Sequence, residues 1–165
     1  MVTVRNRGNF LSPKAFTLME LMIAALILAL ALVGLLGSYI SCMQLTEIMR
    51  NTSIAMNAVQ AKTEEIVEQS QRPLTEPHNF DTLKADFDQA SFTPARLNGI
   101  GVSYVNDTNP NLLVITVSLS WRQSRGMVIG EDKNLNGQWD SGEDTLIVNN
   151  ILDSPAEVVT YIAKR

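Results

Sequence analysis

The amino-acid sequence predicts an α+β fold in which a long N-terminal helix packs on a small antiparallel β-sheet. A mostly apolar run without any charged residue extends from Leu21 to Thr46. A one-sided apolar pattern with helical spacing continues to about residue 71, and strand-like alternation is confined to the chain after residue 98. We therefore expect a leader over residues 1–15, a helix over 16–71 and a globular β domain over 72–165.

The first half of this helix has the length and composition of a membrane span. About twenty residues of α-helix cover roughly 30 Å, the thickness of a bilayer core, and residues 18–40 hold a single charged side chain, Glu20. Residues 1–15 contain Arg5, Arg7 and Lys14 and no acid, which by the positive-inside bias predicts a cytoplasmic N-terminus. The remainder is acidic, so binding to nucleic acid is not expected.

Two removable targeting signals share this arrangement. A secretory signal peptide usually has a shorter apolar run followed by a small-residue cleavage site, and no A-x-A site follows the run here. A lipoprotein signal would end at Cys42, but Tyr39 stands where such signals want a small aliphatic residue. The sequence therefore favours a helix that spans the membrane.

The second half of the helix carries one apolar stripe. Apolar and small side chains recur there every three or four residues, while charged and amide side chains face elsewhere. The stripe consists of Leu45, Ile48, Thr52, Ala55, Val59 and Ile66, with Met49 and Met56 beside it. We expect this stripe to pack on the globular domain, and no proline interrupts the helix before Pro73.

The β domain is expected to begin after an irregular stretch, residues 72–98, with one short helix at Asp81–Gln89. The strongest strand pattern is LLVITVSLSW at Leu112–Trp121, which is rich in Val, Ile and Thr and alternates with period two. The turn-rich link Asn106–Asn111 predicts a hairpin with a strand at Gly101–Val105. Further short strands are expected at Met127–Ile129, Thr145–Val148 and Glu157–Ala163.

The segment Lys14-Ala15-Phe16-Thr17-Leu18-Met19-Glu20-Leu21 resembles the cleavage and methylation motif of type IV prepilins and of the pseudopilins of type II secretion. In that family a peptidase removes a short basic leader, the new N-terminal residue, usually Phe, is N-methylated, and the fifth mature residue is Glu. Phe16 and Glu20 match this register. Ala15 replaces the usual glycine before the cut, and this departure predicts slower cleavage.

The resemblance implies a pilin-like fold and a structural role. It implies cleavage between Ala15 and Phe16, N-methylation of Phe16, and an assembly contact between Glu20 and the Phe16 amine of an adjacent subunit. The implied partners are other pilin or pseudopilin subunits, the prepilin peptidase, an inner-membrane assembly platform and membrane lipid. The implied location is the bacterial inner membrane, with the C-terminal domain in the periplasm, and then a pilus or pseudopilus.

A finer resemblance concerns the kind of subunit. The stretch with Gly34 and Gly37, the short acidic domain and the late VSLSW strand are most similar to PilV-like minor pilins and to minor pseudopilins. The sequence does not distinguish a pilus from a secretion system. It also does not distinguish a position at the filament tip from one in the shaft.

Residues 132–143, DKNLNGQWDSGE, have the spacing of an EF-hand calcium loop. Alternate residues of a tight loop point inward, a glycine at the sixth position permits the sharp turn, and Ca²⁺ takes six to eight oxygen ligands. The predicted ligands are Asp132, Asn134, Asn136, the Gln138 carbonyl, Asp140 and Glu143. Because Asn, Asp and Gly also favour turns, a polar hairpin loop without metal is the alternative.

We expect no enzymatic activity. His78 is the single histidine, Cys42 the single cysteine, and neither a nucleophile with its base nor a phosphate-binding or zinc motif can be assembled around them. Two functions remain. The first is a minor pilin or pseudopilin that assembles through its apolar helix. The alternative is a membrane-anchored, calcium-binding recognition or adhesion domain that does not polymerise.

Overall fold

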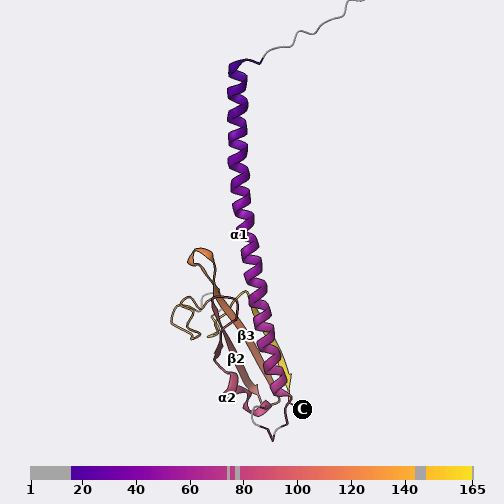
Figure 1. Ribbon diagram of the computed structural model, residues 1–165. Coiled ribbons are helices and arrows are strands. Elements are labelled where there is room, and N and C mark those ends of the chain that lie inside the picture. The colour runs from indigo at the N-terminus through magenta and orange to yellow at the C-terminus, as the bar shows by residue number, and fades with distance from the viewer. Residues whose placement is uncertain (1–15, 74, 77–78, 144–147, 165) are drawn as a thin grey trace, which may run out of the picture. The chain divides into compact units, whose positions relative to one another are not determined.

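The computed structural model describes residues 16–164 except 74, 77–78 and 144–147 (Figure 1). The helices are α1 (Leu18–Ser70), the 3₁₀ turn η1 (Phe80–Thr82), α2 (Leu83–Phe87) and the 3₁₀ turn η2 (Ser124–Gly126). The strands are β1 (Ala90–Phe92), β2 (Gly99–Asn109), β3 (Leu112–Arg122), β4 (Val128–Ile129) and β5 (Glu157–Ala163). The chain divides into two compact units, Met1–Gln44 and Leu45–Arg165.

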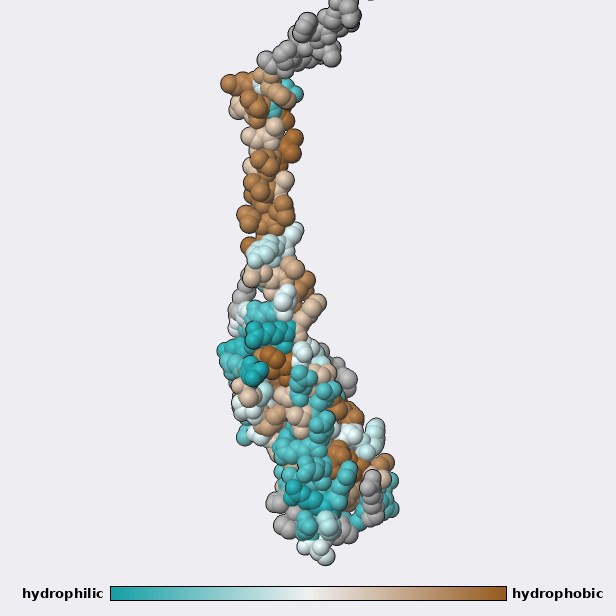
Figure 2. Space-filling view, turned by 45° about the vertical axis from the view of Figure 1, so that its right-hand side comes forward, coloured by the Kyte–Doolittle hydropathy of each residue, from teal (hydrophilic) through white to brown (hydrophobic). Residues whose placement is uncertain are grey.

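In the N-terminal unit, the apolar part of α1 buries nothing within the chain. Every residue from Phe16 to Met43 is exposed, and Figure 2 shows a nearly continuous apolar surface along this part of the helix. Within the described residues, α1 is the one helix long and apolar enough to cross a membrane. Because exposed apolar surface of this extent is unfavourable in water, this part of α1 is suited to lipid or to other apolar helices.

In the C-terminal unit, β3 is the centre of an antiparallel five-stranded sheet. β2 pairs with one edge of β3 and carries β1 on its far side, while β5 and β4 share the other edge of β3. β5 pairs along Leu112–Ser118, and β4 pairs with Trp121 and Arg122. The segment 130–156 therefore leaves the sheet after β4 and returns beside the same strand.

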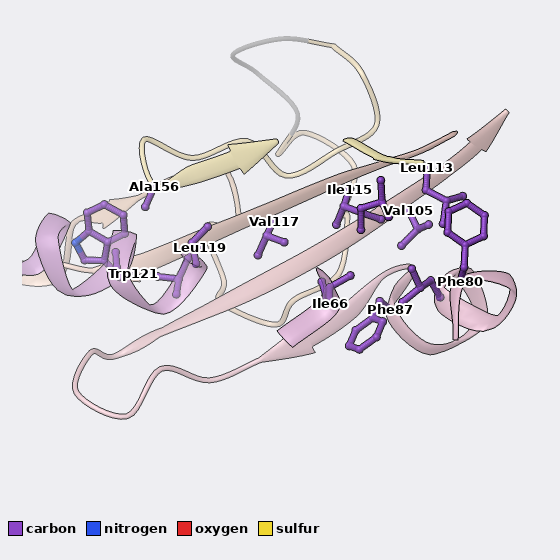
Figure 3. Packing of buried hydrophobic residues seen from close by; sticks show 14 residues of the cluster. Ile66, Phe80, Phe87, Val105, Leu113, Ile115, Val117, Leu119, Trp121 and Ala156 are labelled. Carbon is purple, nitrogen blue, oxygen red and sulfur yellow. The ribbon is translucent and has the colours of Figure 1, made fainter. Parts of the chain in front are cut away.

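One face of the sheet packs on the second half of α1. Alternate β3 side chains share a core with the buried residues Ala55, Val59 and Ile66 of α1. Figure 3 shows Ile66 together with these β3 side chains. The β3 side chains are Leu113, Ile115, Val117, Leu119 and Trp121. The alternation read in the sequence therefore corresponds to burial against the helix, as the pleat of a strand requires. The predicted α+β fold, a long helix on a small antiparallel sheet, is confirmed.

The opposite face of the sheet is covered by the described part of segment 130–156, which excludes residues 144–147. The Ser118 hydroxyl donates to the carbonyl of Leu152 at 2.5 Å, and the Tyr104 hydroxyl accepts the backbone N–H of Leu152 at 3.1 Å. The Leu152 side chain is buried. This second layer explains why Ser118 and Ser120 are buried although they alternate with the core residues of β3.

Several boundaries differ from the sequence-based expectation. The turn expected at Asn106–Asn111 is limited to Pro110 and Asn111, because β2 continues through a bulge as far as Asn109. The helix expected at Asp81–Gln89 is η1 followed by the short α2. β1 was not predicted, since three residues are too few to show alternation. The strand expected at Thr145–Val148 lies almost wholly outside the described residues.

The apolar stripe of α1 is buried only in part. Ala55, Val59 and Ile66 are fully buried, and Thr63 is also buried. Leu45 and Ile48, which the spacing places on the same stripe, remain exposed, as does Met49 beside it. The sheet core reaches α1 only from Ala55 onward, so helical spacing predicted the correct face of the helix but not the length over which that face is covered.

Candidate functional site

The start of α1 is organised by Thr17. The backbone N–H of Glu20 donates to the Thr17 carbonyl at 3.1 Å and lies 3.2 Å from the Thr17 hydroxyl. A threonine before the helix with an acid three residues later is the arrangement that caps helix N-termini. Thr17 and Glu20 therefore have a local role in starting the helix, in addition to any role between subunits.

The electrostatics at this end of α1 favour an acid. Glu20 lies in the first helical turn, where the positive end of the helix dipole stabilises a carboxylate. The side chains of Phe16 and Glu20 are exposed, that of Phe16 by 74%. Among the described residues Glu20 forms no ion pair. Its carboxylate is therefore accessible to a cation from another molecule. Ala15 and the leader lie outside the described residues.

The second candidate site is the loop 132–143 between β4 and β5. The Asp132 carboxylate accepts the backbone N–H groups of Asn136 at 3.1 Å and Gly137 at 2.8 Å. The Asn134 side-chain oxygen accepts the N–H of Asn136 at 2.9 Å, and the Asn136 side-chain oxygen accepts the N–H of Gln138 at 2.7 Å. The oxygens at the first, third and fifth positions are therefore fixed on a tightly wound backbone.

The remaining two carboxylates of the loop close it. Asp140 Oδ2 accepts the side-chain amides of both Asn134 and Asn136 at 2.8 Å. Glu143 Oε1 accepts the backbone N–H of Lys133 at 2.9 Å and lies 3.4 Å from that of Asn134. Glu143 Oε2 is buried and has no hydrogen-bond partner among the described residues.

The structure thus joins the side chains of five predicted metal ligands, all except Gln138, in one hydrogen-bond network. Gln138 was predicted to bind through its carbonyl, and it joins this network through its backbone N–H. Among the described residues, no three His, Cys, Asp or Glu side chains are grouped closely enough to hold a metal by themselves. A cation in this loop would therefore need the amide oxygens of Asn134 and Asn136 as well as the carboxylates. Calcium binding stays a prediction on this geometry.

Three further acids, Glu131, Asp153 and Glu157, lie near one another, and no motif in the sequence indicated them. Glu131 and Asp153 are buried and joined by two hydrogen bonds, Glu131 N–H to the Asp153 carbonyl at 2.9 Å and Asp153 N–H to Glu131 Oε2 at 3.0 Å. Burial raises the pKa of the Glu157 carboxyl, and the charge of Asp153 raises it further. Glu131 lies 22 residues before Asp153, so only the folded chain brings it to Asp153 and Glu157.

A polar pocket of about 360 Å³ lies between the loop and the second face of the sheet. Val102 and Tyr104 of β2 form one side, and Gly137, Gln138 and Trp139 of the loop form another. Gly137 has φ +72°, and a Cβ there would lie 2.9 Å from side-chain atoms of both Ile100 and Ser91. Glycine is therefore required at this position both by the turn and by close packing on the sheet.

Comparison with known proteins supports the reading of the N-terminal segment. Residues 12–36 match the family model described as the prokaryotic N-terminal methylation motif. No curated protein sequence and no solved structure matches the chain significantly. The matched motif lies at the start of α1, so this N-terminal segment is similar to that of type IV prepilins and pseudopilins, as the sequence resemblance implied.

Proposed function

We propose that this protein is a minor pilin or pseudopilin, a structural rather than catalytic subunit of a type IV pilus or a type II secretion pseudopilus. The observation that carries the proposal is the methylation motif at residues 12–36, which overlaps the start of α1, together with the exposure of every residue from Phe16 to Met43. Such a helix can be held by lipid before assembly and by neighbouring apolar helices afterwards.

In this proposal the single acid of the apolar segment acts as an assembly signal. Cleavage before Phe16 creates a positive amine one helical turn from Glu20, and in a filament the amine of an adjacent subunit would neutralise the Glu20 carboxylate. A charge without a partner is costly in an apolar environment. Subunits would therefore be held in the register that pairs the two groups.

The processing step gives a first test. Full-length protein produced with a prepilin peptidase should lose residues 1–15 and gain one N-methyl group at Phe16, as measured by intact mass and N-terminal peptide analysis. Ala15→Gly should accelerate cleavage, since it restores the glycine usual in the family. A chain that stays unshortened and membrane-bound beside an active peptidase would contradict the proposal.

The assembly step gives the second test. Glu20→Ala should leave membrane insertion unchanged but deplete the protein from the sheared filament fraction by about two to three and a half orders of magnitude, because losing one partner of a buried ion pair costs about 3–5 kcal/mol. Glu64→Ala, which removes an exposed acid from the domain part of α1, is the matched control and should assemble normally. Equal incorporation of both variants into filaments would contradict the proposal that Glu20 pairs with the amine of an adjacent subunit.

A membrane-anchored recognition domain that does not polymerise makes a different prediction. Single cysteines introduced at exposed positions of the apolar helix, such as Leu28 and Leu35, in a Cys42→Ser background should cross-link to other pilin-like chains if the protein enters a filament. If the cysteines formed no cross-links while the leader was processed normally, the anchored recognition domain would be favoured instead.

A further inference from the structure

Two buried carboxylates lie in the loop 132–143, and no described Lys, Arg or His side chain forms an ion pair with either of them. Asp132 is 1% exposed and Glu143 is 7% exposed. The basic residue of the loop, Lys133, directs its ammonium to the carbonyl of Gly130 at 2.8 Å. Among the described residues, ion pairs form at Glu65, Asp81 and Asp107 but not at the loop. Because buried acids need a compensating charge, these two favour a cation from solution.

Glu143 gives independent support for a ligand. Its Oε1 is bound by backbone N–H groups, whereas its Oε2 is buried without a hydrogen-bond partner among the described residues. Protein interiors satisfy the great majority of buried polar atoms, so an unpaired carboxylate oxygen calls for a specific cause. A cation bound by the second oxygen of Glu143 would provide that cause.

The neighbouring oxygens are arranged to complete a coordination shell. The carboxylate of Asp132 and the side-chain oxygens of Asn134 and Asn136 are each held by backbone N–H groups of the next turn. An amide or carboxylate oxygen that accepts one hydrogen bond keeps lone-pair capacity for a cation. These groups are therefore preorganised, and binding would need little rearrangement of the backbone.

We propose that residues 132–143 bind one calcium ion through Asp132, Asn134, Asn136, the Gln138 carbonyl, Asp140 and Glu143. The donors are all oxygens, and the loop contains no histidine or cysteine, which disfavours zinc and other metals that prefer nitrogen or sulfur. Three carboxylates with amide and main-chain oxygens suit the large, flexible shell of Ca²⁺ better than the small octahedral shell of Mg²⁺.

Binding at this loop would stabilise the layer that covers the second face of the sheet. Gly137 packs against Ile100 and Ser91, and Gln138 and Trp139 border the pocket above Tyr104. The described part of segment 130–156 contains no helix or strand, so it is held by side-chain hydrogen bonds, packing and a few isolated backbone hydrogen bonds, such as that from the Leu119 N–H to the Ala156 carbonyl. A calcium ion that joins both ends of the loop would fix this layer on the sheet.

Terbium luminescence and calorimetry on the full-length protein in detergent micelles test the proposal. Tb³⁺ takes oxygen ligands as Ca²⁺ does, and Trp139, the eighth residue of the loop and 46% exposed, is placed to sensitise its emission. We expect sensitised emission that Ca²⁺ displaces with a Kd of about 10⁻⁴ to 10⁻³ M, the range of extracellular calcium modules. Mg²⁺ at the same concentration should displace little.

Variants distinguish calcium binding by the loop from non-specific attraction of calcium to the acidic domain. Glu143→Gln and Asp132→Asn should each weaken calcium binding at least tenfold while circular dichroism shows a folded domain. Trp139→Phe should abolish the luminescence but leave the calorimetric Kd unchanged. Glu157→Gln removes an acid outside the proposed ligand set and should bind as wild type.

Two results would overturn the proposal. One is the absence of both sensitised emission and binding heat at calcium concentrations ten times the expected Kd. The other is a loss of affinity in Glu157→Gln equal to that in Glu143→Gln, because it would mean that calcium responds to diffuse negative charge and not to this loop.

Discussion

The two parts of α1 are made of the same secondary structure but have opposite relations to their surroundings. From Phe16 to Met43 every side chain is exposed and almost all are apolar, whereas from Leu45 onward the buried residues lie on one face and contact the sheet. Backbone hydrogen bonding is equally satisfied in both parts. The difference shows that the second part is stabilised within its own domain, while the first needs lipid or other subunits.

The largest expected effect comes from truncating matched apolar side chains in the two parts. Ile66→Ala should lower the free energy of unfolding of the C-terminal domain by about 2–5 kcal/mol, because it opens a cavity in a fully buried core. Leu36→Ala, in the exposed part, should leave that free energy unchanged. Urea denaturation in detergent, followed by the fluorescence of the buried Trp121, measures both values. Similar losses in the two variants would contradict the separation of the two parts.

For membrane insertion the order of the two parts should be reversed: a charge introduced into the first part of α1 should impair insertion, whereas a charge introduced into the second part should not. Leu30→Arg places a charge near the middle of the apolar segment and should cost about 2.5–3.5 kcal/mol of insertion free energy. Asn57→Arg, on an exposed position of the second part, should insert as wild type. Carbonate extraction of membranes and protease protection report the inserted fraction. Normal insertion of Leu30→Arg would show that residues 18–40 do not span the bilayer.

These contrasts also indicate what the sequence could and could not predict. The long helix, the β2–β3 hairpin and β5 follow from local periodicity and turn residues, which are properties of neighbouring positions. The oxygen network at Asp132, Asn134 and Asn136 likewise follows from spacing within one loop. The sequence predicted the helix, the hairpin and β5 because each follows from spacings between near neighbours in the chain. Metal binding by the loop stays a prediction.

The features that were missed depend on contacts between distant segments. β1 exists because Ala90–Phe92 pairs with Gly101–Ser103, and the exposure of Leu45 and Ile48 is set by where the sheet core ends. The grouping of Glu131, Asp153 and Glu157 depends on both ends of segment 130–156 meeting beside β3. These contacts join residues that are far apart in the sequence, so no local pattern predicts them and only the folded chain shows them.

The smallest expected effect is on the pH dependence of stability of the C-terminal domain, in which the carboxyl of Glu157 has a raised pKa. Burial and the charge of Asp153 make the protonated carboxyl of Glu157 more favourable in the folded than in the unfolded state. The folded state therefore binds more protons than the unfolded state between the ordinary glutamate pKa and the raised value. Stability should consequently fall as the pH rises through that window, and be fully present below it.

Glu157→Gln tests this sign. The amide keeps the size of the side chain and cannot ionise, so the decline in melting temperature across mildly acidic pH should flatten, and the variant should be slightly more stable than wild type above the window. Glu64→Gln, at an exposed position of α1, should reproduce the wild-type profile. An unchanged slope in Glu157→Gln would contradict the assignment of this pH dependence to Glu157.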